Sequence, residues 1–256
     1  MNTFTTVDAV NEYRNALSGQ VGCVPTMGAI HEGHLALVEQ ALMENDHVVV
    51  TLFVNPKQFN DPADLAGYPR RDVEDIDLLN QTGVSAVFMP TVEVMYAPDD
   101  SYLVNESCES LDRCGSARPG HFSGVLTVVM KLLNIIKPHR AYFGEKDYQQ
   151  LELIRGMVTA FFMPVEVVGV PTMRAPDGLA LSSRNALLGS SERALAPRLF
   201  QYLNSDDSDY LVKHQLEKAG FTVDYVQTRK NRRYAAVFLG QGSRQVRLID
   251  NVRLTP

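Results

Sequence analysis

Three absences narrow the kind of protein that this sequence can encode. The chain has only three cysteines, Cys23, Cys108 and Cys114. An odd and sparse set does not build a disulfide framework and is typical of a reduced, cytosolic protein. The first nine residues lack the charged and then apolar layout of a signal peptide. We therefore expect a cytoplasmic chain.

Long apolar runs are absent as well. The longest run, Val125 to Ile136, contains Lys131 and Asn134 and is too short to cross a bilayer. Lys137 and Pro138 end it sharply, so the pattern predicts a buried helix. No membrane partner is expected.

The third absence is a block of positive charge. The formal net charge is −6, which argues against an extended nucleic-acid surface, although a small basic pocket for a phosphate-bearing ligand stays open. The 256 residues are 45% hydrophobic. That length and composition suit one large domain, or a large domain with a smaller partner.

The first two-thirds of the chain alternates short apolar strands with helical patterns. Strands are predicted at 20–24, 48–54, 86–89, 141–143 and 165–170, and helices at 35–43, 72–79, 123–137 and 148–162. This alternation predicts a parallel sheet covered on both faces. From about Ser190 the pattern changes to helices near 192–203 and 209–219, followed by strands at 222–228, 234–239 and 246–249. That part predicts a small α+β unit.

Polar, glycine-containing segments follow three of the predicted strands. They are Pro25–Gly28, Asn55–Gln58 and Gly144–Asp147. Ligands of parallel sheets bind outside the carboxyl ends of the strands. The three segments therefore predict a single site at one edge of the sheet.

The most specific segment is PTMGAIHEGH, Pro25 to His34. A strand ends, a glycine permits a tight turn, and a helix begins near His31. His31 and His34 are three residues apart and point off one face, and the helix N-terminus adds free N–H groups and a positive dipole end. This pattern suits the phosphates of a nucleotide. A helix cap with two solvent-facing histidines is the plain alternative, and the spacing disfavours a zinc site, so no structural metal is expected.

Three further segments carry candidate side chains. In FGEKDYQQ, Phe143 to Gln150, Lys146 could reach a phosphate, although a lone Lys-Asp pair is usually a surface ion pair. In DGLALSSRN, Asp177 to Asn185, two serines and an arginine could wrap phosphate oxygens, or form an ordinary turn with a helix cap. In FVNPKQF, Phe53 to Phe59, an amide lies between aromatic residues and suits a small polar ligand carrying methyl groups, or is simply a satisfied turn glutamine.

These four segments, in this order and spacing, resemble the pantothenate synthetase family of the nucleotidylyltransferase superfamily. RPGHFSGVLTVV (118–129) and RLIDN (247–251) also resemble that family. The resemblance covers nearly all of the chain to about residue 198 and weakens until the last residues. Between Pro197 and Tyr225 the chain is shorter than is usual for the family, by about twenty residues.

The resemblance implies an α/β fold, with a Rossmann-like doubly wound parallel sheet at 1–175 and a small, shortened C-terminal α+β lid domain at 176–256. It implies ATP-dependent condensation of pantoate with β-alanine to give pantothenate, AMP and pyrophosphate through a pantoyl-adenylate. ATP, with bound Mg²⁺, pantoate and β-alanine are the implied small-molecule partners. A homodimer is implied, and no nucleic acid or membrane partner.

The resemblance also implies roles for individual residues. His34 matches the catalytic acid, and His31, Lys146, Ser182, Ser183 and Arg184 match groups that act on the phosphates. Gln58 and Gln150 match the pantoate-binding residues, and Gln58 also serves the β-alanine step. The residues that match ATP contacts are Met27, Gly28, Ala29, Ile30, His31, Glu32, Gly33, His34, Gly144, Glu145, Lys146, Asp147, Met173, Leu181, Ser182, Ser183 and Arg184.

Two other functions compete with this interpretation. A pantetheine-phosphate or nicotinate-nucleotide adenylyltransferase shares the histidine helix but attacks with a phosphate, whereas Gln58 and Gln150 suit a small hydroxy acid. A non-catalytic nucleotide-sensing module is disfavoured by the intact His34, Lys146 and Arg184.

Overall fold

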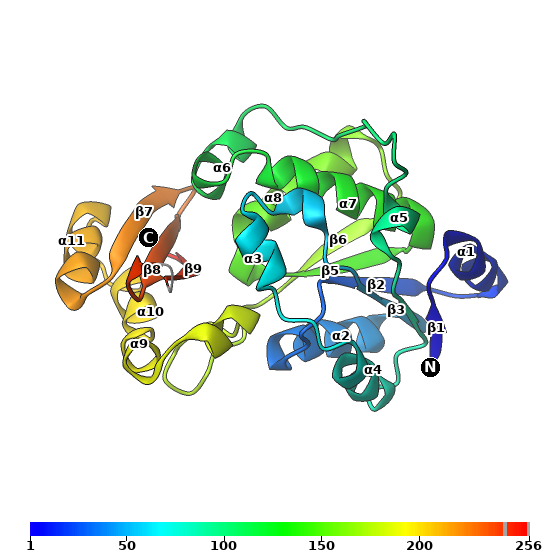
Figure 1. Cartoon of the computed structure of the whole chain (residues 1–256), viewed down its shortest axis with the longest axis horizontal. Helices are drawn as coiled ribbons and strands as arrows, with labels where there is room; N and C mark the ends of the chain where they lie inside the picture. Colours follow the sequence, from blue (N-terminus) through cyan, green and yellow to red (C-terminus); the bar gives the residue numbers. More distant parts are fainter. Residues whose placement is uncertain (243–244, 255–256) are drawn as a thin grey trace. The chain divides into compact units, whose positions relative to one another are not determined.

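The structure is a computed structural model that describes residues 1–242 and 245–254. The chain forms two compact units (Figure 1). Unit 1 contains Met1–Gly144 and Gln149–Val170, and unit 2 contains Glu145–Tyr148 and Pro171–Pro256.

Unit 1 is built on a six-stranded parallel sheet with the order β1-β4-β3-β2-β5-β6. Its strands are β1 (Asn2–Phe4), β2 (Val21–Thr26), β3 (His47–Leu52), β4 (Ala86–Phe88), β5 (Arg140–Gly144) and β6 (Glu166–Val170). The order runs outward in one direction from β2 through β3 and β4, and in the other from β5 to β6. The boundary between β2 and β5 is therefore the topological switch point, where ligands of such sheets bind.

Helices cover this sheet because its central strands are apolar throughout. Every residue of β3 except the first is buried, so both faces need a packed layer. The helices are α1 (Val7–Ala16), α2 (Glu32–Glu44), α3 (Pro62–Ala66), α4 (Asp72–Asn80), α5 (Val92–Met95), α6 (Cys114–Ala117), α7 (His121–Ile136) and α8 (Tyr148–Ala160), with 3-10 turns η1 (Pro56–Gln58) and η2 (Glu109–Leu111). Figure 1 shows α2 and α4 on one side of the sheet and α7 on the other. The run 125–136, predicted as a buried helix, lies in α7.

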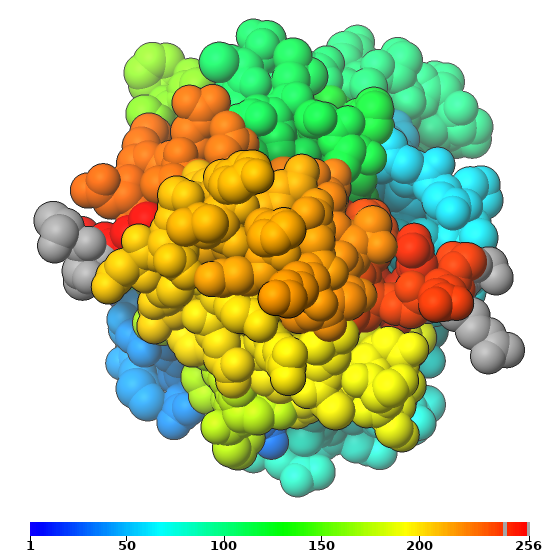
Figure 2. Space-filling view, turned by 90° about the vertical axis from the view of Figure 1, so that its left-hand side faces the viewer, coloured from blue at the N-terminus to red at the C-terminus, as the bar shows by residue number. Residues whose placement is uncertain are grey.

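Unit 2 packs helices against a three-stranded antiparallel sheet of order β7-β8-β9. Its elements are η3 (Glu145–Asp147), η4 (Ser183–Leu187), α9 (Ser190–Leu195), α10 (Arg198–Leu203), α11 (Asp209–Ala219), β7 (Thr222–Arg229), β8 (Arg232–Leu239) and β9 (Val246–Arg253). Its apolar core includes Leu199, Leu203, Leu216, Val237 and Leu248. Figure 2 shows one face of this unit, where the yellow and orange residues of the helical segment form a continuous surface.

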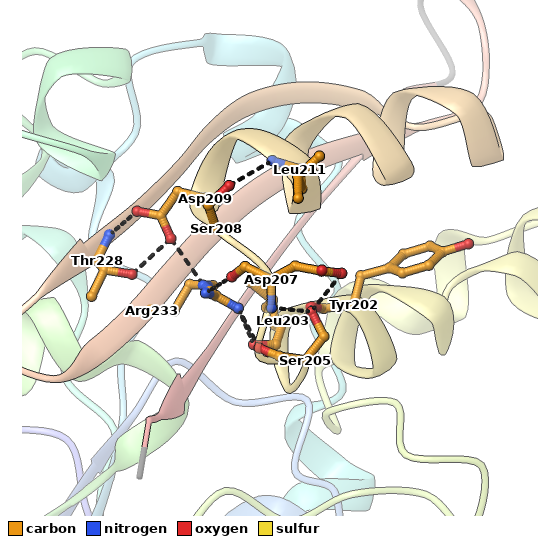
Figure 3. Close-up of polar contacts among 9 residues, drawn as sticks. All are labelled: Tyr202, Leu203, Ser205, Asp207, Ser208, Asp209, Leu211, Thr228 and Arg233. Carbon is orange, nitrogen blue, oxygen red and sulfur yellow. Dashed lines mark hydrogen bonds and ion pairs between the residues drawn. The ribbon is translucent and has the colours of Figure 1, made fainter. Parts of the chain in front are cut away.

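One buried arginine organises the turn between α10 and α11 (Figure 3). The guanidinium of Arg233, on β8, donates to the backbone carbonyls of Leu203, Ser205 and Asp207 and to Asp209 Oδ1. Asp209 also accepts from the backbone N–H and the hydroxyl of Thr228, each at 2.7 Å. The turn and the start of α11 are therefore tied to two strands of the sheet, β7 and β8.

The predicted α/β class and parallel sheet are confirmed, and the boundaries differ in detail. The N-terminal β1 and α1 were not predicted, because β1 has three residues and the apolar positions of α1 are few. The helix predicted near 192–203 is two short helices, since Pro197 begins the second one without a side-chain cap. The last strand continues to Arg253, four residues beyond the predicted end.

Candidate active site

The polar segments after β2 and β3 leave the sheet side by side. Pro25 and Thr26 pair with Thr51 and Leu52 at the ends of these parallel strands. The Thr26 hydroxyl donates to the Thr51 carbonyl at 2.8 Å, and the backbone N–H of Phe53 donates to the Thr26 carbonyl at 3.1 Å. The neighbouring β5 ends at residue 144 on the other side of β2. The carboxyl ends of β2, β3 and β5 therefore lie at the same edge of the sheet.

The turn after β2 takes an unusual backbone shape that a buried carboxylate supports. Gly28 has φ of 78° and Ala29 has φ of 50°, both in the left-handed region. Two successive N–H groups, of Ala29 and Ile30, donate to the two oxygens of Asp75 at 2.7 Å each. A Cβ at Gly28 would lie 3.0 Å from Asp75 Oδ2, so glycine allows this approach.

Asp75 lies on α4 and is 2% exposed. Burial raises the pKa of Asp75, while its two backbone hydrogen bonds oppose that shift. Sequence reasoning missed this residue. The helix 72–79 carries several acidic side chains, and no local signal marks the one that turns inward.

The two histidines of the first motif meet at the start of α2. His31 is the N-cap residue and not part of the helix, and its Nδ1 accepts from the backbone N–H of Gly33 at 3.1 Å. In the neutral ring the proton therefore sits on Nε2. The ring centroids of His31 and His34 are 4.1 Å apart, so the two imidazoles form one cluster at the positive end of the helix dipole.

Gln58 is held in a dense polar network at the end of η1. The backbone carbonyl oxygen of Gln58 lies 2.7 Å from Nδ1 of His121, and it accepts a hydrogen bond from the Arg118 guanidinium at 3.3 Å. Its side-chain Oε1 accepts from Asn55 Nδ2 at 3.1 Å, and its Nε2 donates to Met27 Sδ at 3.0 Å. The structure thus brings together Gln58 and Met27, which come from two different motifs.

The RPGHF segment supports this loop from α7. A Cβ added at Gly124 would lie 2.2 Å from the Lys57 carbonyl oxygen, so only glycine lets α7 pass the loop so closely. The Gly124 carbonyl also accepts from Asn55 Nδ2 at 3.0 Å. The resemblance noted for residues 118–129 therefore corresponds to a packing role beside Gln58.

Two adjacent glutamines at the start of α8 differ in their surroundings. Gln149 is buried and structural, because its Nε2 donates to the carbonyls of Glu109 and Asp112 and its Oε1 accepts from the Cys114 N–H. Gln150, the predicted pantoate residue, lies half-buried at the next position of the same helix.

In unit 2, a side chain of β9 holds the GEKD turn. Asn251 Nδ2 donates to the carbonyls of Glu145 and Lys146, each at 2.9 Å. Arg232 donates to Asn251 Oδ1, and its guanidinium lies 3.6 Å from the ring centroid of Tyr148. Asn251 belongs to the RLIDN segment, so this segment holds the backbone of the GEKD turn in place.

Lys146 Nζ lies 3.3 Å from Asp147 Oδ2, so the two residues form the ion pair that was the alternative to a phosphate contact. The Lys146 side chain is largely buried, whereas that of Asp147 is exposed. Met173 and Leu181 are joined by a backbone hydrogen bond of 2.9 Å, from the N–H of Leu181 to the carbonyl of Met173. Ser182 caps the 3-10 turn η4, accepting from the N–H of Arg184 at 3.3 Å. These last residues therefore lie on one small hairpin and turn of unit 2.

Residues 1–242 and 245–254 show neither a metal cluster nor a membrane helix. No group of three or more His, Cys, Asp or Glu side chains there could hold a metal ion. No helix in that part of the chain combines the length and apolar character that a bilayer crossing requires.

A doubly wound parallel sheet with an imidazole pair at its switch point defines a Rossmann-like α/β nucleotide-binding protein. The family model for pantoate-beta-alanine ligase matches residues 2–253. A pantothenate synthetase of Bdellovibrio bacteriovorus is 49% identical over 242 residues, covering 94% of this chain and 95% of that protein. The chain belongs to the pantoate–β-alanine ligase family, and it is an enzyme that joins pantoate to β-alanine in an ATP-dependent reaction.

A solved relative has the same fold throughout. The pantoate-beta-alanine ligase from Francisella tularensis, in complex with beta-gamma ATP and beta-alanine, superposes with a TM-score of 0.93 at 39% identity, covering 99% of this chain and 97% of that one. A pantothenate synthetase of Legionella pneumophila is 44% identical over 256 residues, covering 99% of this chain and 100% of that protein. The short length of this chain is therefore shared with another pantothenate synthetase.

Proposed function

We propose that this chain makes pantothenate in two steps on the residues named above. ATP and pantoate first form pantoyl-adenylate and pyrophosphate, and β-alanine then displaces AMP. The observation that carries the proposal is the imidazole pair at the start of α2, at the switch point of the sheet. A Francisella relative that binds a form of ATP and β-alanine supports the same substrates here.

In the first step, a carboxylate oxygen of pantoate attacks the α-phosphorus of ATP, and the bond to the bridging oxygen of pyrophosphate breaks. Negative charge grows on the phosphate oxygens, so catalysis consists of positioning and charge stabilisation. His31 and His34 donate to these oxygens, with His34 as the catalytic acid. Lys146, Ser182, Ser183 and Arg184 are further donors to the phosphates.

The remaining contacts select the substrates. Gln58 and Gln150 bind pantoate, and Gln58 also serves the β-alanine step. The ATP contacts are the backbone and side chains of residues 27–34, 144–147 and 181–184, together with Met173. In the second step the free amine of β-alanine attacks the acyl carbon, AMP leaves, and the nitrogen loses a proton.

We further propose that residues 176–256 act as a lid that keeps water from the acyl-adenylate. Mg²⁺ bound with ATP would supply neutralising charge at the phosphates. A homodimeric, cytoplasmic protein is part of the same proposal.

The decisive experiment separates the two steps. Pyrophosphate release is measured with ATP and pantoate alone, and AMP and pantothenate are measured after β-alanine is added. We expect His34→Ala to lower pyrophosphate release by about 10²–10³-fold, the usual cost of one such donor. His214→Ala, at an exposed position on α11, is the matched control and should match the parent. A folded His34→Ala protein with parental pyrophosphate release would exclude the proposed role.

A further inference from the structure

The amide of Asn55 has an orientation that the backbone around it decides. Asn55 Oδ1 accepts from the backbone N–H of Lys57 at 3.2 Å, and Asn55 Nδ2 donates to the carbonyl of Gly124 at 3.0 Å. A backbone N–H only donates and a backbone carbonyl only accepts, so the two ends of this amide cannot be exchanged. Asn55 is 1% exposed, which prevents water from taking over either contact.

The orientation of the Asn55 amide determines that of the Gln58 side-chain amide. Because Asn55 Nδ2 is a donor, the atom of Gln58 that faces it at 3.1 Å must be the acceptor Oε1. The opposite end of the Gln58 amide, Nε2, therefore points toward Met27 of the first motif, at 3.0 Å from its sulfur. A thioether is a weak acceptor, and a substrate oxygen would take its place at little cost.

Tyr96 completes the arrangement from the other side. Its hydroxyl donates to Asn55 Oδ1 at 2.8 Å, the second hydrogen bond to that oxygen. Its ring is fixed in turn, because the ammonium groups of Lys57 and Lys131 lie 4.3 and 4.7 Å from the ring centroid. Both acceptor sites of Oδ1 are therefore filled, and the Tyr96 hydroxyl restrains the position of the Asn55 amide that faces Gln58.

We infer that Tyr96 is a positioning residue for pantoate: its hydroxyl holds the Asn55 amide, whose orientation the backbone sets, in the place where Gln58 presents its side-chain N–H groups to an oxygen of the substrate. The inference rests on the proposed role of Gln58. It assigns the chemistry of this part of the pocket: the group bound there is a hydrogen-bond acceptor, such as a carboxylate or hydroxyl oxygen.

The test uses Tyr96→Phe, which removes the hydroxyl and leaves the ring. Pyrophosphate release is measured while pantoate and ATP are varied in turn. We expect the KM for pantoate to rise by about 5–10-fold, the usual worth of one buried hydrogen bond, with the KM for ATP within about two-fold of the parent. Tyr102→Phe, at a tyrosine that is 85% exposed, is the matched control and should change neither value.

A double variant separates positioning from a structural role. In Gln58→Ala, where no amide remains to be oriented, adding Tyr96→Phe should change the KM for pantoate by less than about two-fold. An unchanged KM for pantoate in Tyr96→Phe overturns the inference, and so does an equal rise for both substrates. The inference is also overturned if Tyr96→Phe has its full effect in the Gln58→Ala background.

Failure of the inference is distinguishable from failure of the proposed function. If Gln58→Ala itself leaves the KM for pantoate unchanged, the proposed role of Gln58 is wrong and the inference falls with it. If Gln58→Ala raises that KM and Tyr96→Phe does not, only the inference is wrong. Gln58→Glu adds a direct check on polarity: a carboxylate facing the substrate oxygen should raise the KM for pantoate by at least about ten-fold.

Discussion

Arg233 offers a sharp test of what holds the C-terminal unit together. Its side chain is 4% exposed and donates to three backbone carbonyls and one carboxylate (Figure 3). One of those carbonyls belongs to Leu203, the last residue of α10, so the cation also meets the negative end of that helix dipole. Replacing Arg233 by methionine keeps much of the apolar stem and removes every one of these contacts.

The loss of stability in Arg233→Met follows from the buried acceptors that remain without a donor. Removing one partner of a buried, hydrogen-bonded charge costs about 3–5 kcal/mol, because the remaining acceptors stay unpaired. For a chain of this length 1 kcal/mol corresponds to about 2–4 °C in Tm, so Arg233→Met should lower Tm by roughly 6–20 °C. Arg233→Lys should recover only a small part of the loss, since an ammonium has three donors and cannot reproduce the planar fork of a guanidinium.

The assay is thermal unfolding combined with hydrogen exchange resolved by peptide. Exchange should rise in peptides from α10, α11 and β8 and stay parental in the strands of unit 1. Arg193→Met is the matched control, because its ion pair with Asp177 is well exposed on both sides and should be worth less than about 1 kcal/mol. The reasoning is refuted if Arg233→Met and Arg193→Met unfold at the same temperature.

Three further predictions concern single sites. Asp75→Asn should lower pyrophosphate release by at least about ten-fold in a folded protein, because the new amide N–H faces an N–H of the first motif; a parental rate would contradict this. Gly124→Ala should destabilise the chain by about 1–3 kcal/mol in urea unfolding, whereas Gly156→Ala, with open space around its Cβ in α8, should be neutral or stabilising, and similar values for the two would be inconsistent with the close approach. Burial raises the pKa of Cys23 to about 12, so iodoacetamide at pH 8 should label the exposed Cys108 and leave Cys23 unmodified until urea is added, as mass spectrometry can verify.

Local patterns in the sequence predicted the parallel sheet and marked the segments in which we propose the active-site residues. The alternation of apolar strands and helices is a property of neighbouring residues, and so are the glycines and histidines of the 25–34 motif. The convergence of the segments after β2 and β3 also followed, because all strands of a parallel sheet end at the same edge. Those inferences need only the hydrophobic periodicity of each element and the common direction of the strands in a parallel sheet.

The supporting residues could not be predicted in this way. Asp75 reaches a loop 45 residues earlier in the chain, and Asn251 reaches a turn more than 100 residues away. Each is one polar residue among several on its own element, and only the packing of helix or strand decides which one turns inward. Strand β1 was missed for a related reason, since three residues at the edge of a sheet carry no periodicity.

The sequence by itself thus determined the class of fold and the order of the motifs, and it supplied the residues that we propose to contact phosphate and pantoate. The tertiary structure decided how those groups are held: Asp75 accepts from the N–H groups of the turn before the histidines, and Asn55, bound to the Gly124 carbonyl and to the Tyr96 hydroxyl, orients the Gln58 amide. The physical reason is that residue type and local spacing are written along the chain. The donor or acceptor that completes a buried polar group comes from a distant segment and is chosen only when the chain has packed.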